Sequence, residues 1–130
     1  MSMKKSIALI VAVIVIVTAF QLMTNGGNAM LIDLSDSAIT FSGIDDFRHE
    51  VPYAEIESLA LEDIADWNSY PGHEFGHFRV GHMTDYVLFV STQADNVIIA
   101  TLTDGSQMVF NYNHRSDTEA LYNILLENVQ

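Results

Sequence analysis

Residues 86–111 of the chain, YVLFVSTQADNVIIATLTDGSQMVFN, decide the fold. This stretch contains three runs rich in β-branched and aromatic side chains, at 86–90, 97–101 and 107–111, and such runs favour β-strands. Asp104-Gly105 lies between the second and the third run, and this dipeptide is a strong signal for a tight β-hairpin. The stretch therefore predicts three strands, of which the last two form a hairpin.

Four segments upstream also have strand character, and turn-forming residues separate them. Residues 56–61 suit a strand with one irregularity better than a helix, because helix caps are missing. Residues 66–72, DWNSYPG, are typical of a loop. With the three later runs the chain predicts about seven strands, and the four upstream segments are Ala38–Phe41, Arg48–Val51, Ile56–Leu61 and Phe78–Val80.

The C-terminal segment changes from strand to helix periodicity. Ser116-Asp117-Thr118-Glu119 has the sequence of a capping box, in which the Ser116 hydroxyl accepts a hydrogen bond from the backbone N–H of Glu119. Hydrophobic residues then follow at helical spacing and form one apolar stripe: Leu121, Ile124, Leu125 and Val129. Strands first and a helix last predict a mainly β fold, a small antiparallel barrel capped by one C-terminal helix.

Three parts of this pattern resemble bacterial pleckstrin-homology-like (PH-like) domains of membrane-anchored proteins. They are residues 51–59 (VPYAEIESL), 76–78 (GHF) and 111–122, which end on DTEALY. The resemblance covers residues 36–127 and implies a PH-like antiparallel barrel of seven strands with a binding role. PH domains that bind phosphoinositides use basic residues of the first hairpin loop. Residues 43–48 here contain two acids and one base, so phosphoinositide binding is not implied.

The N-terminal region predicts a membrane anchor. Lys4-Lys5 precedes residues 7–23, in which only Thr18 and Gln21 are polar. A helix of that length spans about 25 Å, slightly less than a hydrocarbon core of about 30 Å, and lysine side chains that reach the headgroups cover the difference. The lysines are expected to stay in the cytoplasm. We therefore expect a single-pass protein of the cell membrane whose C-terminal domain lies outside the cytoplasm.

This topology divides the chain into a cytoplasmic N-terminus at residues 1–5, a transmembrane anchor at 6–23, a linker at 24–35 and one domain at 36–130. The alternative is a cleaved signal peptide, because the small-residue triplet Gly27-Asn28-Ala29 follows the apolar run. The domain would then be secreted after cleavage near Ala29. Both interpretations place the domain outside the cytoplasm.

The charge of the chain is one-sided. Its 130 residues include five Lys and Arg against 17 Asp and Glu, for a net charge of −12. Both lysines precede every acid, so the chain after Lys5 has three arginines against 17 carboxylates, which leaves −14. Such a surface repels nucleic-acid backbones and anionic lipid headgroups, so neither nucleic acid nor phosphoinositide is an expected partner. The lack of cysteine excludes thiol catalysis, disulfides and Cys-based zinc sites.

His73-Glu74-Phe75-Gly76-His77 matches H-E-x-x-H, which on a helix places two histidines around zinc and a glutamate beside the metal-bound water. His82 is a candidate third ligand, but it misses the metzincin spacing by one residue. Gly76 interrupts the motif, and Phe78 and Val80 alternate with polar residues, which is strand periodicity. Along a strand the two histidines lie about 13 Å apart, too far to share one ion.

We therefore expect no catalytic residue, no metal and no cofactor at this motif. A small zinc-dependent hydrolase stays an alternative, with His73, His77 and His82 as ligands and Glu74 as base. A further alternative is a pH-responsive or weakly metal-binding cluster of the same three histidines, since histidine titrates near neutral pH.

Trp67 and Tyr70 are the predicted binding residues, because exposed aromatic side chains in a loop often anchor a protein partner. The alternative is that both fold back and plug the end of the barrel. The sequence as a whole favours a membrane-anchored, exported binding or scaffold module with a protein partner, and not an enzyme. A structural accessory subunit of a membrane assembly is the remaining alternative.

Overall fold

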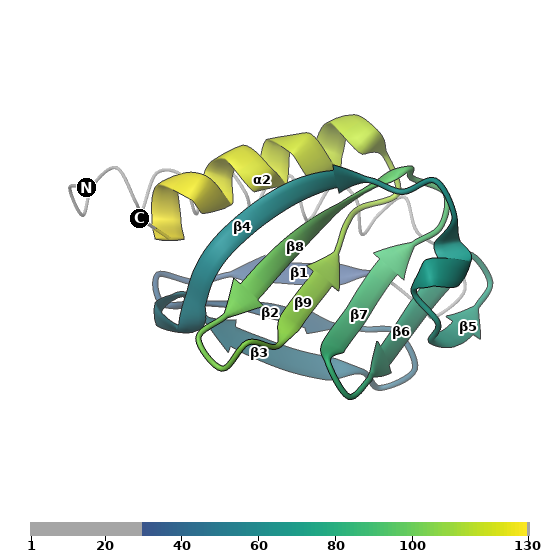
Figure 1. The fold of residues 1–130 in the computed structure, drawn as a ribbon, viewed down its shortest axis with the longest axis horizontal. Coiled ribbons are helices and arrows are strands. Elements are labelled where there is room, and N and C mark those ends of the chain that lie inside the picture. Colours follow the sequence, from purple (N-terminus) through teal and green to yellow (C-terminus); the bar gives the residue numbers. More distant parts are fainter. Residues whose placement is uncertain (1–29, 130) are drawn as a thin grey trace.

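The computed structural model describes residues 30–129, which form two β-sheets and one long helix (Figure 1). The smaller sheet has the order β1-β2-β3 and is antiparallel: β1 is Leu31–Leu34, β2 Ala38–Ser42 and β3 Arg48–Pro52. The larger sheet has the order β4-β8-β9-β7-β6-β5: β4 is Ile56–Asp63, β5 His73–Phe75, β6 Phe78–His82, β7 Tyr86–Ser91, β8 Asn96–Leu102 and β9 Gln107–Phe110. The helix α2 is Arg115–Val129, and two 3₁₀ turns are η1 at Tyr53–Glu55 and η2 at Trp67–Ser69.

The mainly β fold with one C-terminal helix is confirmed, but the predicted PH-like antiparallel barrel of about seven strands is wrong. Within residues 30–129, nine strands form separate sheets of three and six strands, with no ladder that closes them into a barrel. β9 lies between β7 and β8, and it pairs parallel with β7 and antiparallel with β8. The helix α2 packs against β4 and β8 and runs along β4 in Figure 1. A helix, and not a further strand, therefore covers the β4 edge of the larger sheet.

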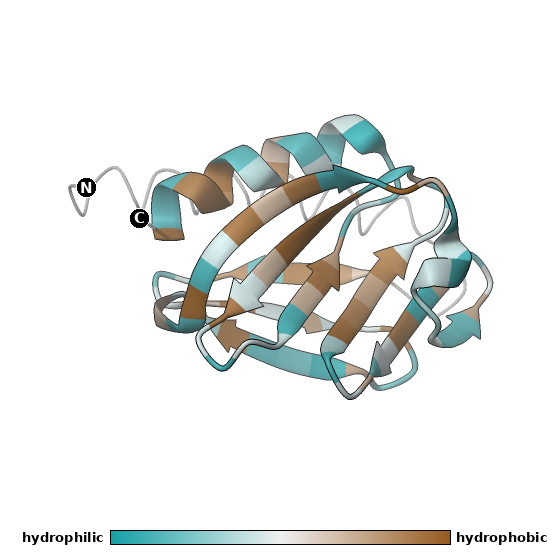
Figure 2. Cartoon of the chain, in the orientation of Figure 1, coloured by the Kyte–Doolittle hydropathy of each residue, from teal (hydrophilic) through white to brown (hydrophobic). Residues whose placement is uncertain are grey.

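The main hydrophobic core lies between the two sheets. The ring of Phe41 on β2 packs against Phe110 of β9 and Phe89 of β7, with ring centroids 4.8 and 5.5 Å apart. Leu121 and Leu125 of α2 join this core. Figure 2 shows the long hydrophobic stretches of β7, β8 and β9, which are typical of strands buried on both faces. On the outer face of the six-stranded sheet, Ile64, Trp67 and Tyr70 pack against a second buried cluster.

Most predicted strands are present, and the irregularity expected in residues 56–61 is confirmed. The register between β4 and β8 shifts between Ile56 and Ser58. Two strands escaped the sequence analysis because they are short. β1 has four residues inside the predicted linker 24–35, and β5 has three residues, His-Glu-Phe, without a β-branched side chain.

The predicted capping box is wrong: with Ser116 as the N-cap the helix would begin at Asp117, but α2 begins two residues earlier, at Arg115. The carbonyl oxygen of His114 accepts hydrogen bonds from the N–H groups of Asp117 and Thr118, so Ser116 already lies inside the first turn. The hydroxyl of Thr118 instead accepts a hydrogen bond from the backbone N–H of Tyr112, at 2.9 Å. Thr118, and not Ser116, therefore ties the chain before α2 to the helix.

No helix within residues 30–129 has the length and hydrophobicity to span a bilayer. The membrane anchor predicted at residues 6–23 lies outside the described residues, as does the triplet at 27–29 where a signal peptide would be cleaved.

Candidate functional site

The H-E-x-x-H motif lies on a β-hairpin and not on a helix. β5 and β6 pair with His73 opposite Val80 and Phe75 opposite Phe78, and Gly76-His77 form the turn between them. Gly76 has a φ of +63°, which glycine adopts without a steric penalty. The hairpin places His73 at the start of β5 and His77 beyond its end, so the two imidazoles do not share a helical face as a zincin requires. Residues 30–129 contain no group of three His, Asp or Glu side chains that could hold a metal ion.

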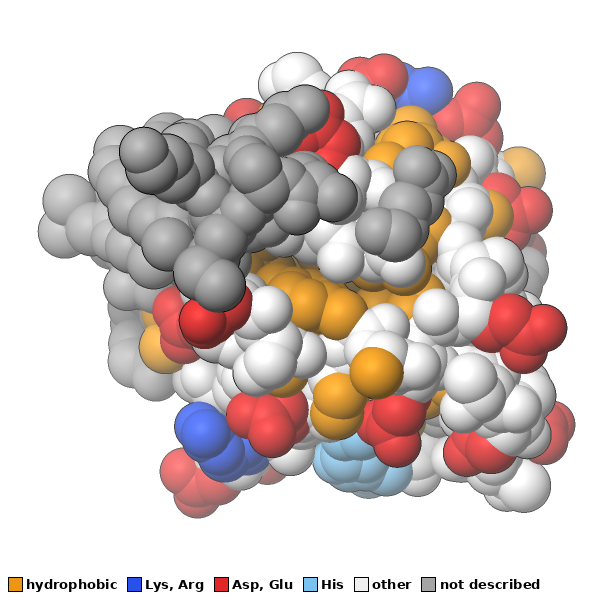
Figure 3. Space-filling model, turned by 90° about the vertical axis from the view of Figure 1, so that its left-hand side faces the viewer, with side chains coloured by type: hydrophobic (Ala, Val, Ile, Leu, Met, Phe, Trp, Pro, Cys, Tyr) orange, Lys and Arg blue, Asp and Glu red, His pale blue; other side chains and the backbone are white. Residues whose placement is uncertain are grey.

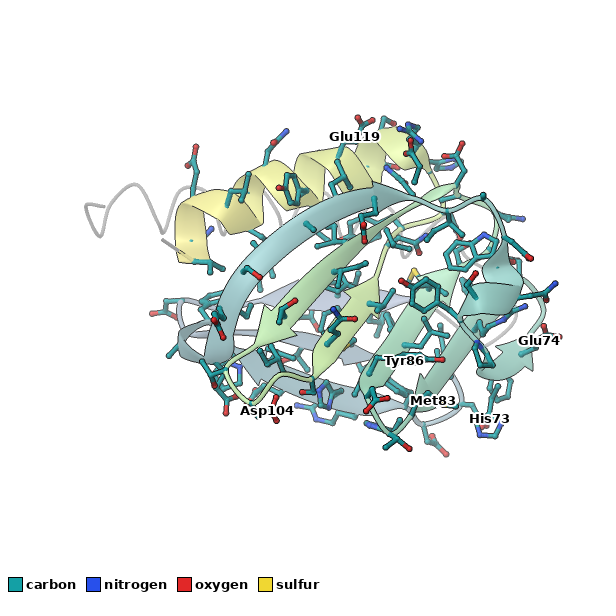
Figure 4. All side chains as sticks on the ribbon, in the orientation of Figure 1. His73, Glu74, Met83, Tyr86, Asp104 and Glu119 are labelled. Carbon is teal, nitrogen blue, oxygen red and sulfur yellow. The ribbon has the colours of Figure 1, made fainter. Side chains whose placement is uncertain are left out.

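His73 and His82 do come together, with residues from the smaller sheet. Both line a groove of about 460 Å³ between the β2–β3 turn and the β5–β6 hairpin. Its other lining residues are Asp45, Asp46, Phe47, Arg48, Phe75, Val80 and Gly81. Met83, next to the groove, is 38% exposed and is the exposed large hydrophobic side chain of the described region. Figure 4 shows His73 and Met83 at the same end of the larger sheet.

The β2–β3 turn supplies the acidic side of the groove. The N–H of Phe47 donates to the carbonyl oxygen of Ile44 at 2.8 Å, so Asp45 and Asp46 are the central residues of a tight turn. Their φ angles are +46° and +58°, as in the type I′ turns that match the twist of a hairpin. This left-handed conformation costs an L-amino acid about 1–2 kcal/mol in general, and aspartate tolerates it better than most residues. Buried Ile44 and Phe47 hold the turn from both ends.

A stack of rings joins the two sheets, and two of its members, Phe47 and His82, line the floor of the groove. The Phe47 ring stacks on the His82 imidazole, with centroids 4.9 Å apart and an angle of 19° between the planes. Phe47 also stacks on Phe89 of the core at 5.2 Å. The imidazole of His49 on β3 contacts His82 edge-on, at 5.3 Å and 72°. These contacts tie the groove to three strands, β3, β6 and β7, and to one turn, so its shape is set by the core.

The surroundings of His49 oppose its protonation. Partial burial holds the pKa of His49 below its ordinary value of 6.5, and the neighbouring His82 lowers it further. The carboxylate of Glu55 acts in the opposite direction. His49 therefore stays neutral to a lower pH than an exposed histidine.

Trp67 and Tyr70 lie outside this groove, on the outer face of the larger sheet. There they cover a second buried hydrophobic cluster, formed by Leu88, Val90, Val97, Ile99 and Val109. The indole N–H of Trp67 donates to the carbonyl oxygen of Ala94 at 3.2 Å, and the Tyr70 ring meets Tyr86 edge-on at 5.7 Å. The two aromatics thus fold back onto the protein, over a sheet face and not over the end of a barrel. Their role in binding stays a prediction.

Arg79 holds the loop of Trp67 and Tyr70 in place. Its guanidinium donates to the carbonyl oxygens of Trp67 and Tyr70, at 2.6 and 3.1 Å, and pairs with Glu74 at 2.6 Å. Gly72 follows in the same loop, and a Cβ atom there would lie 2.9 Å from Leu88 Cδ2. Glu74, the base of the zinc hydrolase alternative, is thus the salt-bridge partner of a structural arginine.

Ion pairs neutralise two of the three arginines in the described residues. Arg79 pairs with Glu74, and Arg115 pairs with Asp63 and Asp95. Because 17 carboxylates face so few bases, the surface stays strongly acidic. Figure 3 shows acidic side chains spread over the face that contains the end of α2, with few basic ones between them.

Comparisons with known proteins give no indication of the function. A scan against protein-family models and searches of curated proteins and of solved structures found no match for the chain. The sequence analysis named His73 and His82 but missed Phe47 and His49. The available signal was the pair Asp45-Asp46 between hydrophobic Ile44 and Phe47, a pattern typical of a hairpin turn with buried flanks.

Proposed function

We propose that the protein is a binding module whose groove takes a positively charged segment of a partner protein. The observation that carries this proposal is the groove itself, where two aspartates from a left-handed turn lie opposite His73, Phe75 and His82 of the larger sheet. Left-handed non-glycine residues are costly, and such conformations cluster at functional sites.

The chemistry of the groove suits a lysine or arginine side chain. Phe47 and Phe75 offer apolar surface to an aliphatic stem, and Asp45 and Asp46 offer carboxylates to the charged end. The net charge of −14 after Lys5 attracts a basic segment from a distance and repels acidic competitors. The exposed thioether of Met83 adds an adaptable apolar contact at the rim.

The membrane anchor at residues 6–23 belongs to the same proposal. Lys4-Lys5 ahead of the apolar run supports an orientation in which the groove faces outward from the cell. Protease added outside intact cells or spheroplasts should then digest the domain, whereas protection until lysis would show that the orientation is wrong.

The binding proposal is tested by titrating the full chain, in a nonionic detergent, with a short peptide of alternating lysine and glycine. The double variant Asp45→Asn/Asp46→Asn keeps a residue that tolerates the turn but removes both charges, and it should bind about tenfold more weakly. Glu119→Gln is the control, because it removes one charge from α2, away from the groove (Figure 4). Equal loss in both variants would mean that binding reflects overall charge, and no binding by the unaltered chain would overturn the proposal.

A further inference from the structure

Three of the five histidines of the chain gather at the groove. His73 and His82 line it, and His49 contacts His82 from β3. The other two lie elsewhere, since His77 is in the turn at the far end of β5 and His114 directly precedes α2. Histidine is the side chain whose ordinary titration falls near neutral pH. This concentration on one site needs an explanation beyond packing, because both His73 and His82 are exposed.

We propose that the groove is proton-regulated: it binds a basic segment while His49, His73 and His82 are neutral and releases that segment when they become positively charged. This inference rests on the proposed binding function and adds that the pH of the surrounding medium controls the binding.

The charge balance of the groove supports release in acid. While the histidines are neutral, Asp45 and Asp46 outnumber the single lining arginine, Arg48. Protonation of His73 and His82 reverses this balance and places like charges beside a bound lysine or arginine. The charged groups near the pair His49–His82 are Glu55 of η1, which acts on His49, and Asp45, Asp46 and Arg48, which line the groove with His82. Histidine is the side chain whose ordinary charge change falls between about pH 5 and 8, so the three histidines supply the charge change in this range.

The ring stack gives protonation a second effect. His82 lies between Phe47 and His49, so a charge on both imidazoles brings two cations together at ring-contact distance. Burial and His82 already lower the pKa of His49, so the surroundings oppose a charge on His49. Repulsion between the charged rings loosens the floor on which the ligand rests.

The test measures binding of the lysine-glycine peptide to the full chain in nonionic detergent at about pH 7.5 and about pH 5.5. We expect affinity to fall by about tenfold or more at the lower pH, given the strength of like-charge repulsion at these distances. The triple variant His49→Gln/His73→Gln/His82→Gln should lose most of this difference, and His114→Gln should keep it. Circular dichroism at both pH values confirms that each variant stays folded.

Reciprocal linkage provides a second measurement that needs no variant. If protons expel the peptide, the bound peptide must equally oppose proton binding. Saturating peptide should therefore move the NMR titration midpoint of the His82 imidazole to lower pH. Equal affinity at both pH values, an unchanged or raised midpoint, or pH dependence that persists in the triple variant would each overturn the regulation and leave the binding function standing. Absence of binding at both pH values would overturn the binding function and the regulation together.

Discussion

The imidazole of His82 lies nearly parallel to the ring of Phe47, with centroids 4.9 Å apart and planes 19° apart. This contact joins β6 of the larger sheet to the turn between β2 and β3 of the smaller one. No strand ladder connects the sheets in the described region, so side chains hold this side of the sandwich together. Because no ladder joins the two sheets here, a groove lies between the β2–β3 turn of the smaller sheet and β5 and β6 of the larger one.

Residues 30–130 are expected to fold without the N-terminal segment, because the hydrophobic cores lie within residues 30–129. The fragment should be soluble, close to monomeric, and mainly β by circular dichroism with a helical contribution from α2. A predominantly helical spectrum would contradict the fold.

The stability of this fragment should depend on pH through His49. The pKa of His49 is lowered in the folded state, so the unfolded chain takes up the proton first as the pH falls through about 6.5. The stability that neutral His49 contributes is therefore complete above that pH. The free energy of unfolding decreases below it, until the folded state is protonated as well. Urea unfolding at a series of pH values measures this slope.

His49→Gln is the matched variant for that series, since glutamine carries no charge at any pH. Its unfolding free energy should decrease less between neutral and mildly acidic pH than that of the unaltered fragment. Parallel curves for the two proteins would show that His49 does not contribute to the acid sensitivity.

Asn111 should be among the most sensitive polar positions. Its buried side chain accepts from the N–H of Ser91 at 2.7 Å and donates to the carbonyl oxygens of Ser91 and Asn96, at 3.0 and 2.9 Å. Asn111→Ala leaves these buried backbone groups without partners, which should cost about 2–4 kcal/mol of unfolding free energy. The exposed helix position Asn123→Ala is the control and should change stability by less than about 0.5 kcal/mol. Similar values for both variants would refute the role of the Asn111 network.

Thr118 should be much more sensitive than Ser116 to replacement by alanine. Thr118→Ala removes the acceptor for the buried N–H of Tyr112 and should cost about 1–3 kcal/mol. Ser116→Ala should change stability by less than about 0.5 kcal/mol, because Ser116 is exposed and lies inside the first turn of α2. Chemical denaturation of both variants decides whether the capping box or the observed helix start describes the protein in solution.

The sequence predicted elements well where the local pattern was strong. The Asp104-Gly105 hairpin and the strands around it are present, because turn chemistry and β-branched runs act locally. The order of the strands was not accessible in this way. Whether β9 pairs with β7 depends on contacts between distant residues, and no short-range pattern encodes them.

The same limit applies to the site. His73 and His82 were candidates because His73 begins the H-E-x-x-H motif and His82 follows it closely, yet the companion that the motif gives to His73 is His77, which does not line the groove. The hairpin turn carries His77 to the far end of β5, whereas the fold of the smaller sheet brings Phe47 and His49 to His82. Tertiary packing alone creates that group, so a single sequence contains little sign of it.

The most direct test of the binding groove is an NMR titration of isotope-labelled protein with the lysine-glycine peptide at about pH 7.5. The account predicts the largest shift changes in the amide signals of residues 45–49 and in those around His73 and His82. Changes centred instead on the loop of Trp67 and Tyr70, or no changes at all, would contradict it.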